Sequence, residues 1–406
     1  MRFLLVTNSN NPPIGTASQW ADLMGIFNYI YNMRLTKPEK MLFALLKGSL
    51  LNCDVELQLF ENATAQEWDD CYAAASKQGV LALAWEGVQT LPLDLQPPKQ
   101  LKFKWAMSVD KYEARHRRYC HTVQELQQLY KEYGIIAVQM KGVGFSAGYS
   151  QPHHREGGDI DIYTYSADIS RMSHGEANSL ADKLMEQIGN PVEMHGYKHS
   201  NFYFKGIPVE NHKYFLNVQI NRKFLGGLNE LLHKELEPRE VELYNGEYKL
   251  LVPSPIFNTL FISCHAFQHY GSGIALHHLY DWAVILKNYG LHLPCELKNE
   301  KFLRAIAAMT HLCNLHLGTS IDLSGYPDGY EEMADEMLKE MLYPIYSKVV
   351  PHTGYTKIFI YKTRKVLRSA KLANDVFGAS IFGRIMESFI AHVMHPSTIF
   401  GRGDEK

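Results

Sequence analysis

Two aspartates separated by one residue are the side chains in this chain best suited to chemistry. Asp159 and Asp161 alternate with Ile160 and Ile162 directly after a pair of glycines. Side chains two apart on a strand share a face, so both carboxylates are predicted to project together while the isoleucines enter the core. Two neighbouring carboxylates repel unless a cation lies between them, and oxygen ligands suit Mg²⁺ or Mn²⁺. The pattern predicts a metal site; the alternative is a solvated strand edge or a capped turn.

A turn upstream of these aspartates has the properties of a phosphate site. Residues 135–140 are predicted to form a buried strand, the pair Lys141 and Gly142 ends it, and residues 144–149 fit one or two helical turns. Backbone N–H groups at a helix N-terminus bind phosphates, and basic side chains add positive charge. The candidate nucleotide-binding residues are therefore Lys141, Gly142, Gly144, Ser146 and Arg155.

A third acid is predicted on a neighbouring strand. Residues 200–205 alternate, a turn follows at Gly206, and residues 208–212 can return as an antiparallel strand. Glu210 and His212 share one face of that strand. An acid at this position can approach the aspartate pair from the side, as a third metal ligand must; the alternative is an exposed acid on the sheet.

The order of these residues resembles the uncharacterised nucleotidyltransferase family within the DNA polymerase β-like nucleotidyltransferase superfamily. The motif residues are Lys141, Gly142, Tyr149, Pro152, Arg155 and the Gly-Asp-Ile-Asp of 158–161. Residues 208–212 are similar to the family's third-carboxylate strand. Residues 254–286 are similar to its helical segment with two histidines and a later aspartate. The resemblance covers about two-thirds of the chain, from residue 40 to residue 317.

This resemblance implies a fold and an activity. The fold is α+β, a nucleotidyltransferase-type mixed β-sheet flanked by helices. The activity is transfer of a nucleotidyl group from an NTP, such as ATP, to a hydroxyl of a small molecule, a protein or an RNA end. Asp159 and Asp161 would bridge two Mg²⁺ or Mn²⁺ ions, and Glu210 would complete the site of the metal that activates the acceptor oxygen. Two features depart from the superfamily pattern: Val143 follows Gly142 in place of glycine or serine, and the third acid is glutamate rather than aspartate.

A group of histidines supports two other interpretations. His265 and His269 are four residues apart, so on a helix they share a face that can bind a transition metal. With Asp281 they suggest a metal-dependent phosphohydrolase that resembles HD-domain proteins, although Leu279 and Tyr280 separate His278 from Asp281. The other interpretation is an acceptor pocket, lined by His212, His265, His269 and Asp281. An inactive nucleotide-binding module is a third alternative, which the three retained acids disfavour.

A basic segment lies near the C-terminus. Between residues 357 and 371 there are six basic side chains and no acidic one: Lys357, Lys362, Arg364, Lys365, Arg368 and Lys371. Phe359 and Tyr361 lie among them. The segment is interpreted as a solvated helix face or, alternatively, as a contact for a polyanion such as RNA or an anionic metabolite.

Composition limits the class of protein. The 406 residues are 46% hydrophobic and 21% charged, and a formal net charge of -2 gives no global attraction to nucleic acid. Six cysteines show no Cys-x-x-Cys spacing, which favours a reducing cytoplasm. The first apolar run is too short for a signal peptide, and no segment reaches transmembrane length, so no membrane partner is expected.

The elements that must position these groups divide the chain into four predicted regions. They are a peripheral extension (1–37), a helical N-terminal region (38–99), a nucleotidyltransferase core (100–253) and a helical C-terminal domain (254–406). Thr64 and Glu67 predict a capping box, and residues 98–133 a long helix. Ser166 to Asp168 are predicted to cap a helix that ends near residue 188, and Asn245 with Gly246 predicts a hairpin. Further helices are predicted over 225–237, 255–270, 275–289, 302–317, 330–342 and 380–393.

Overall fold

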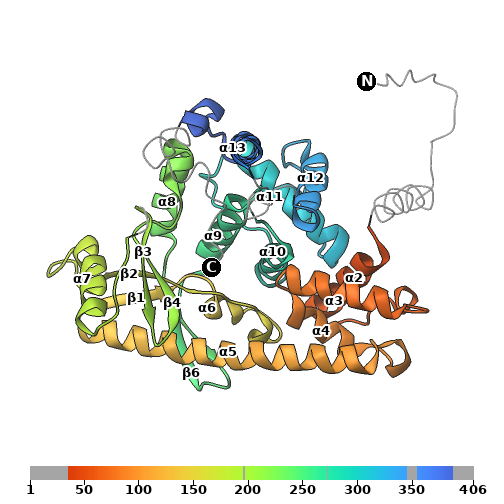
Figure 1. The fold of residues 1–406 in the computed structure, drawn as a ribbon. Coiled ribbons are helices and arrows are strands. Elements are labelled where there is room, and N and C mark those ends of the chain that lie inside the picture. The colour runs from red at the N-terminus through yellow and green to blue at the C-terminus, as the bar shows by residue number, and fades with distance from the viewer. Residues whose placement is uncertain (1–34, 195–196, 272, 345–353, 387–406) are drawn as a thin grey trace.

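The fold is known from a computed structural model that describes residues 35–194, 197–271, 273–344 and 354–386 (Figure 1). The predicted N-terminal extension and the last part of the predicted helix 380–393 lie outside these residues. Within them, no helix combines the length and the apolar character that crossing a membrane requires.

A four-stranded mixed sheet, with the strand order β1-β2-β4-β3, carries two of the predicted acids, Asp161 and Glu210. The strands are β1 (Ile135–Gln139), β2 (Ile160–Ser166), β3 (His199–Phe204) and β4 (Ile207–His212). β1 pairs antiparallel with β2, β2 runs parallel to β4, and β3 pairs antiparallel with β4. The mixed sheet with flanking helices confirms the predicted α+β fold.

The helix α5 (Lys99–Glu132) is the longest element described and connects two hydrophobic cores. It begins after Pro98 and ends before Gly134, whose φ of 71° lies in the left-handed region that glycine adopts at little cost. Figure 1 shows it running beneath both the sheet and the N-terminal helices. Its first half contributes Trp105 to the helical core, and its second half contributes Tyr130 to the core beneath the sheet.

One hydrophobic core is built from helices of the N-terminal and C-terminal parts of the described chain. The N-terminal helices are α2 (Lys37–Leu51), α3 (Ala65–Lys77) and α4 (Leu81–Thr90). The C-terminal helices are α9 (Pro255–Gln268), α10 (Leu276–Tyr289), α11 (Glu300–Leu312), α12 (Tyr330–Leu342) and α13 (Tyr355–Phe377), with a π-helical turn at Cys313–Leu317. Fully buried side chains from both groups, such as Leu42 and Trp282, belong to one cluster. The two helical regions, distant in sequence, therefore fold against each other.

Smaller elements complete the sheet region. Near the sheet these are α6 (Val143–Ser146), α7 (His174–Gln187), the hairpin β5 (Arg239–Leu243) and β6 (Tyr248–Val252), and a 3₁₀ turn at Pro152–His154. The helical core also includes α8 (Arg222–Lys234), and further 3₁₀ turns lie at Leu57–Leu59, Leu93–Leu95 and Val218–Ile220. Gln127 of α5 links the hairpin to the main sheet, since its Nε2 donates to the carbonyls of Ala137 (3.0 Å) and Leu251 (2.9 Å).

Local signals set several of these boundaries. The predicted capping box is confirmed: the Glu67 N–H donates to Thr64 Oγ1 at 3.2 Å, and the Thr64 N–H donates to Glu67 at 2.8 Å. The helix predicted to start at Ser166 to Asp168 begins seven residues later, with Ser173 as its N-cap. Asp168 is used in a local turn instead, because its carboxylate accepts the N–H of Ser170 at 3.0 Å.

Candidate active site

Parallel pairing of β2 and β4 brings two of the predicted acids together. Asp161 lies in register with Glu210, and neighbouring residues on paired strands project to the same face. His212, two residues further along β4, shares that face. Its Nε2 lies 3.1 Å from Asp161 Oδ1 and 3.3 Å from Glu210 Oε2. One potential ligand atom from each of these three side chains lies within 4.8 Å of the others, so the group can hold a metal ion.

The orientation of His212 is fixed from behind. Its Nδ1 lies 3.2 Å from the carbonyl oxygen of Tyr214, which can only accept a hydrogen bond. Nδ1 therefore donates. The two carboxylates at Nε2 can only accept, so Nε2 also carries a hydrogen in this arrangement, and a metal ion bound here would replace that hydrogen on the Nε2 lone pair. A backbone carbonyl behind a histidine in this way is the usual support of a metal-ligating imidazole.

Lys141 approaches the same carboxylates from the end of β1. The hydrogen bond from the Met140 N–H to the Asp161 carbonyl (3.0 Å) extends the β1–β2 ladder and places Lys141 beside Asp161. The Lys141 ammonium lies 3.1 Å from Asp161 Oδ2 and 3.9 Å from Asp159 Oδ1. The side chain of Asp161 is 1% exposed and that of Asp159 is 37% exposed. One acid is therefore enclosed, and the other lies at the mouth of the site.

The acids differ in pKa because their neighbours differ. The charge of Asp161, with burial, raises the pKa of Asp159 to about 6. Burial alone would raise the pKa of Asp161, but Lys141 and a hydrogen bond from His212 outweigh it and lower that pKa. Burial likewise opposes ionisation of Glu210, yet the hydrogen bond with His212 lowers its pKa. The enclosed Asp161 and the partly buried Glu210 are thus held as carboxylates, and Asp159 is the acid that protonates first as the pH falls.

Two basic residues of the site were missed in the sequence. Lys198 precedes β3, and its pKa is lowered by burial while the charges of Asp161, Glu210 and Asp159 oppose the change. His199 Nε2 lies 3.6 Å from Glu210 Oε2. His199 pairs directly with His212 across β3 and β4, a register that follows from the turn at Gly206. Applying that register to the sequence would have placed His199 on the site face.

The turn after β1 is tight, but two of its predicted nucleotide ligands face inward. Gly142 has a φ of 64°, and a Cβ there would lie 3.0 Å from Gln139 Nε2. A Cβ on Gly144 would lie 2.7 Å from Val252 Cγ1, so this glycine allows α6 to pack against β6. Ser146 is fully buried, its Oγ 2.8 Å from His116 Nε2. Gly144 and the Ser146 side chain therefore contribute to packing, and contact of this turn with a nucleotide stays a prediction.

Arg155 and Asp281 also differ from their predicted roles. The Arg155 guanidinium donates to both carboxylate oxygens of Asp281, at 2.9 Å and 2.7 Å, and the two side chains are 10% and 6% exposed. The hydroxyl of Tyr149 donates to the same carboxylate. Asp281 thus joins α10 to the loop before β2 and does not line a pocket with the histidines, and Arg155 is engaged with protein rather than directed at a phosphate.

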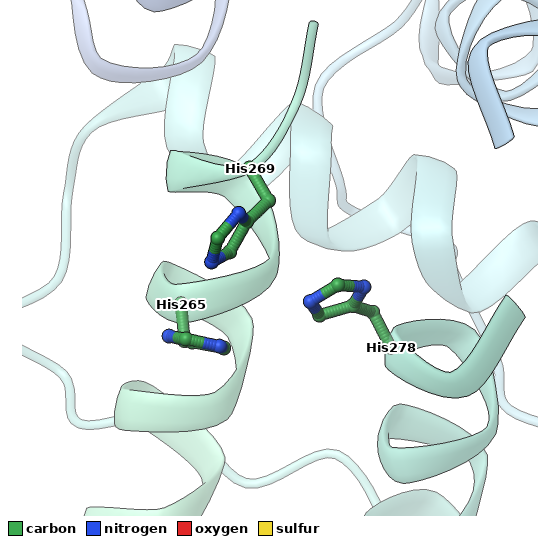
Figure 2. A group of neighbouring side chains, drawn as sticks. All are labelled: His265, His269 and His278. Atoms are coloured by element: carbon green, nitrogen blue, oxygen red, sulfur yellow. The ribbon is translucent and has the colours of Figure 1, made fainter. Parts of the chain in front are cut away.

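Three histidines form a compact group (Figure 2). His265 and His269 lie on consecutive turns of α9, and His278 faces them from α10. The ring centroids are 4.7 to 5.6 Å apart, and one nitrogen from each ring lies within 4.8 Å of the others. Burial first, and then the charge of Lys141, holds the pKa of His265 well below its ordinary value. The histidine group on α9 and α10 is therefore close enough to Lys141, which pairs with the acids, to be affected by its charge.

A backbone hydrogen bond makes this trio a poor metal centre. The N–H of Ala275 donates to His278 Nδ1 at 3.1 Å, closing the first turn of α10. With that lone pair in use, the hydrogen of the neutral ring resides on Nε2, which then has no lone pair for a metal. Metal binding through Nε2 would leave the Ala275 N–H facing a second donor. The trio is better suited to hydrogen bonding than to metal binding.

Another cluster of residues of metal-ligating type, around His154, stabilises the fold through ion pairs. His154 Nδ1 lies 2.7 Å from Glu86, and its Nε2 lies 3.1 Å from Glu113. Carboxylates at both nitrogens stabilise the doubly protonated ring. Burial lowers the pKa of His154, but the two glutamates outweigh burial and raise it. The imidazolium therefore connects the loop before β2 to both α4 and α5.

The predicted basic segment lies on α13, and acids neutralise part of it. Arg368 pairs with Glu340 of α12 at 2.7 Å, and Lys371 pairs with Asp375 at 2.7 Å. These pairs agree with the interpretation of a helix face and reduce the charge available to a polyanion.

Comparisons with known proteins identify a family for this chain. The sequence profile of a family described as "Uncharacterised nucleotidyltransferase" matches residues 64–318. Among curated proteins, none matches the chain. A crystal structure of an antigenic nucleotidyltransferase-like protein from Paracoccidioides brasiliensis is similar over 51% of this chain and 95% of that one, with 14% identity and a TM-score of 0.34. Since the profile spans more than half of the sequence and includes Asp159, Asp161 and Glu210, the chain belongs to the uncharacterised nucleotidyltransferase family.

Proposed function

We propose that this protein transfers a nucleotidyl group from an NTP to a hydroxyl of an acceptor, with Mg²⁺ or Mn²⁺ bound at Asp159, Asp161 and Glu210. The observation that carries the proposal is the pairing of Asp161 with Glu210 on parallel strands, with Asp159 two residues before Asp161. Membership of the family supports the reaction class.

The donor set fits a hard divalent cation. The buried Asp161 and the partly buried Glu210 provide carboxylate oxygens, and His212 presents Nε2 between them. Oxygen-rich sites of this kind suit Mg²⁺ or Mn²⁺. A cation bound here would neutralise charge on the phosphates and lower the pKa of an acceptor hydroxyl. Asp159 is not part of the closest group, so its contribution to binding should be weaker than that of Asp161.

Other residues of this chain would orient the substrates. Lys141, the Gly142 turn and Lys198 supply positive charge and backbone donors beside the acids, in reach of a triphosphate. Glu210 is the candidate acceptor of the hydroxyl proton, since its carboxylate is held ionised by His212. His265, which feels the charge of Lys141, and its neighbour His269 are candidates for holding the acceptor.

The phosphohydrolase alternative receives less support. It requires Asp281 beside His265 and His269, but Asp281 binds Arg155 and Tyr149. The remaining trio includes His278, whose Nδ1 is occupied by a backbone N–H. An inactive binding module would have no need for two neighbouring carboxylates held ionised in one site.

Labelled nucleotides test the proposal directly. The protein with Mg²⁺ or Mn²⁺ is incubated with α-labelled and γ-labelled NTPs and with pools of RNA, protein and small-molecule acceptors. Transfer predicts that only the α label enters an acceptor, with release of pyrophosphate. Asp161→Asn should lower this incorporation by about 10²- to 10⁴-fold, whereas the exposed Asp70→Asn should leave it unchanged. Release of γ-labelled phosphate without α-label transfer would contradict the proposal.

A further inference from the structure

The position of Lys141 makes it a rival of the metal for the same carboxylates. Its ammonium lies 3.1 Å from Asp161 Oδ2 and 3.9 Å from Asp159 Oδ1. Within the described part of the chain, Asp161 Oδ2 accepts no hydrogen bond that satisfies ordinary geometry, so this ion pair is its main interaction. A cation that binds both aspartates must therefore displace the lysine from Oδ2.

Displacement is feasible because of the chemistry of lysine. Its charge is a compact ammonium on a flexible four-carbon stem, so it can move several ångströms while the backbone stays in place. The backbone at Lys141 is held by the β1–β2 ladder on one side and by Gln139, whose Nε2 donates to the Lys141 carbonyl at 2.7 Å, on the other. The stem is therefore the movable part.

The destination of the displaced ammonium is set by charge. Away from the aspartates, the ammonium would approach Lys198 and His265. Its positive charge already lowers the pKa of both side chains, so neither offers it a favourable partner. A desolvated ammonium without a carboxylate is costly. A triphosphate beside the Gly142 turn would provide the missing negative charge, so the lysine and the nucleotide stabilise each other once the metal is bound.

We propose that Lys141 is an internal counter-cation that couples metal binding to nucleotide binding. Without nucleotide, it occupies the carboxylates and weakens the binding of divalent cations; with nucleotide, it is drawn to the phosphates and releases them. The inference rests on the proposed function, since it assumes that the acids bind a metal and that a triphosphate lies beside them. Coupling between two ligands is reciprocal, so each should strengthen the binding of the other by the same factor.

Titration with Mn²⁺ tests the coupling without measuring catalysis. Mn²⁺ affinity is measured by electron paramagnetic resonance, with and without an NTP analogue whose α–β bridging oxygen is replaced by methylene. Free Mn²⁺ is corrected for binding to the analogue itself. In the wild type, the analogue should tighten protein-bound Mn²⁺ by about 5- to 150-fold, the usual range of such couplings. In Lys141→Met, Mn²⁺ should bind tighter than in the wild type without analogue, and the enhancement should shrink towards one.

Two further variants separate this role from general electrostatics and from misfolding. Lys198→Met removes a different positive charge near the acids. Because Lys198 is a candidate phosphate contact, this variant should bind the analogue more weakly, but with the analogue at saturation it should retain the coupling. Lys141→Arg keeps a charge that grips a carboxylate through two hydrogen bonds, so it should bind Mn²⁺ no more tightly than the wild type, and it remains informative if Lys141→Met fails to fold.

The outcomes are distinguishable. Loss of coupling in Lys198→Met as well as in Lys141→Met would assign the effect to general charge and overturn the inference. The inference would also be overturned if Mn²⁺ affinity is unchanged in Lys141→Met and raised in Lys141→Arg. If wild type and Asp161→Asn bind Mn²⁺ equally weakly with the analogue present, the proposed metal site itself fails. If Mn²⁺ binding depends on Asp161 but not on Lys141, the metal site stands and only the counter-cation role is rejected.

Discussion

The guanidinium of Arg155 and the carboxylate of Asp281 form a buried two-hydrogen-bond pair that joins the loop before β2 to helix α10. Tyr149 donates a third hydrogen bond to the same carboxylate, and its ring stacks on Tyr280 with centroids 5.5 Å apart. The hydroxyl of Tyr280 lies 2.9 Å from Ser49 of α2. The loop that leads to Asp159 and strand β2 is thereby fixed to the helical core.

Removal of Arg155 should therefore destabilise the fold. Arg155→Ala leaves the carboxylate of Asp281 buried without its partner, and breaking a buried pair in this way costs about 3–5 kcal/mol. Denaturant unfolding of wild type and variant measures this loss. Arg171→Ala is the control, because its partner Asp168 is exposed and the pair is worth at most about 1 kcal/mol. Wild-type stability with a selective loss of NTP affinity in Arg155→Ala would restore the role in phosphate binding that the sequence predicted.

The example shows which part of the site was accessible from sequence. Strand periodicity places Asp159 and Asp161 on one face, and a two-residue turn sets the β3–β4 register that aligns Glu210, because both depend on contacts local in sequence. The pairing of β2 with β4 joins residues about 50 positions apart. The sequence predicted that Glu210 could approach the aspartates from a neighbouring strand, and the family resemblance supported this, but neither gave the parallel register. Arg155 and Asp281 are 126 positions apart, and no local pattern signals such a pair. Long-range polar partners were therefore the main source of error.

Asp159 should make the stability of the protein depend on pH. Its pKa is about 6 in the folded state against 3.8 ordinarily, so the folded state binds its proton more tightly than the unfolded state. The stability associated with that proton is fully present below pH 4 and is lost as the pH rises through 6. In EDTA, Asp159→Asn should therefore stabilise the protein at pH 7.5 relative to the wild type, by on the order of 1 kcal/mol after allowing for solvent screening. At pH 4 the two proteins should be alike.

Thermal or urea unfolding at both pH values checks this prediction. The exposed Asp70→Asn is the control and should show no such difference between the two pH values. A wild type that is more stable than Asp159→Asn at pH 7.5 would mean that Lys141 outweighs the repulsion between the aspartates.

His154 should give a pH dependence at higher pH. Glu86 and Glu113 raise its pKa in the folded state, so its stabilisation is fully present below about pH 6.5 and is lost as the pH rises through the folded-state value. While the pH lies between these two values, the loss approaches about 1.4 kcal/mol per pH unit. Urea unfolding between pH 6 and pH 9 should show a decline in wild type that is absent in His154→Gln. His121→Gln, altered at an exposed position, should decline like the wild type; identical slopes for wild type and His154→Gln would refute the imidazolium.

Glu210 and His269 together distinguish nucleotidyl transfer from phosphohydrolysis. Glu210 lies beside Asp161 and is held ionised by His212, whereas His269 belongs to the histidine group on α9 and α10. If the reaction is transfer, Glu210→Gln should lower turnover by about 10²-fold or more while NTP binding persists, because the phosphates retain Lys141 and the aspartates retain the metal. His269→Ala should instead raise the KM for the acceptor and leave slow hydrolysis of NTP nearly unchanged, as expected of a positioning residue. Phosphohydrolysis predicts the reverse, with a transition metal that co-purifies with the wild type and disappears in His265→Ala and His269→Ala. Elemental analysis of these proteins, combined with the labelled-nucleotide assay, decides between the two, and histidine-dependent metal with activity indifferent to Asp161→Asn would reject transfer.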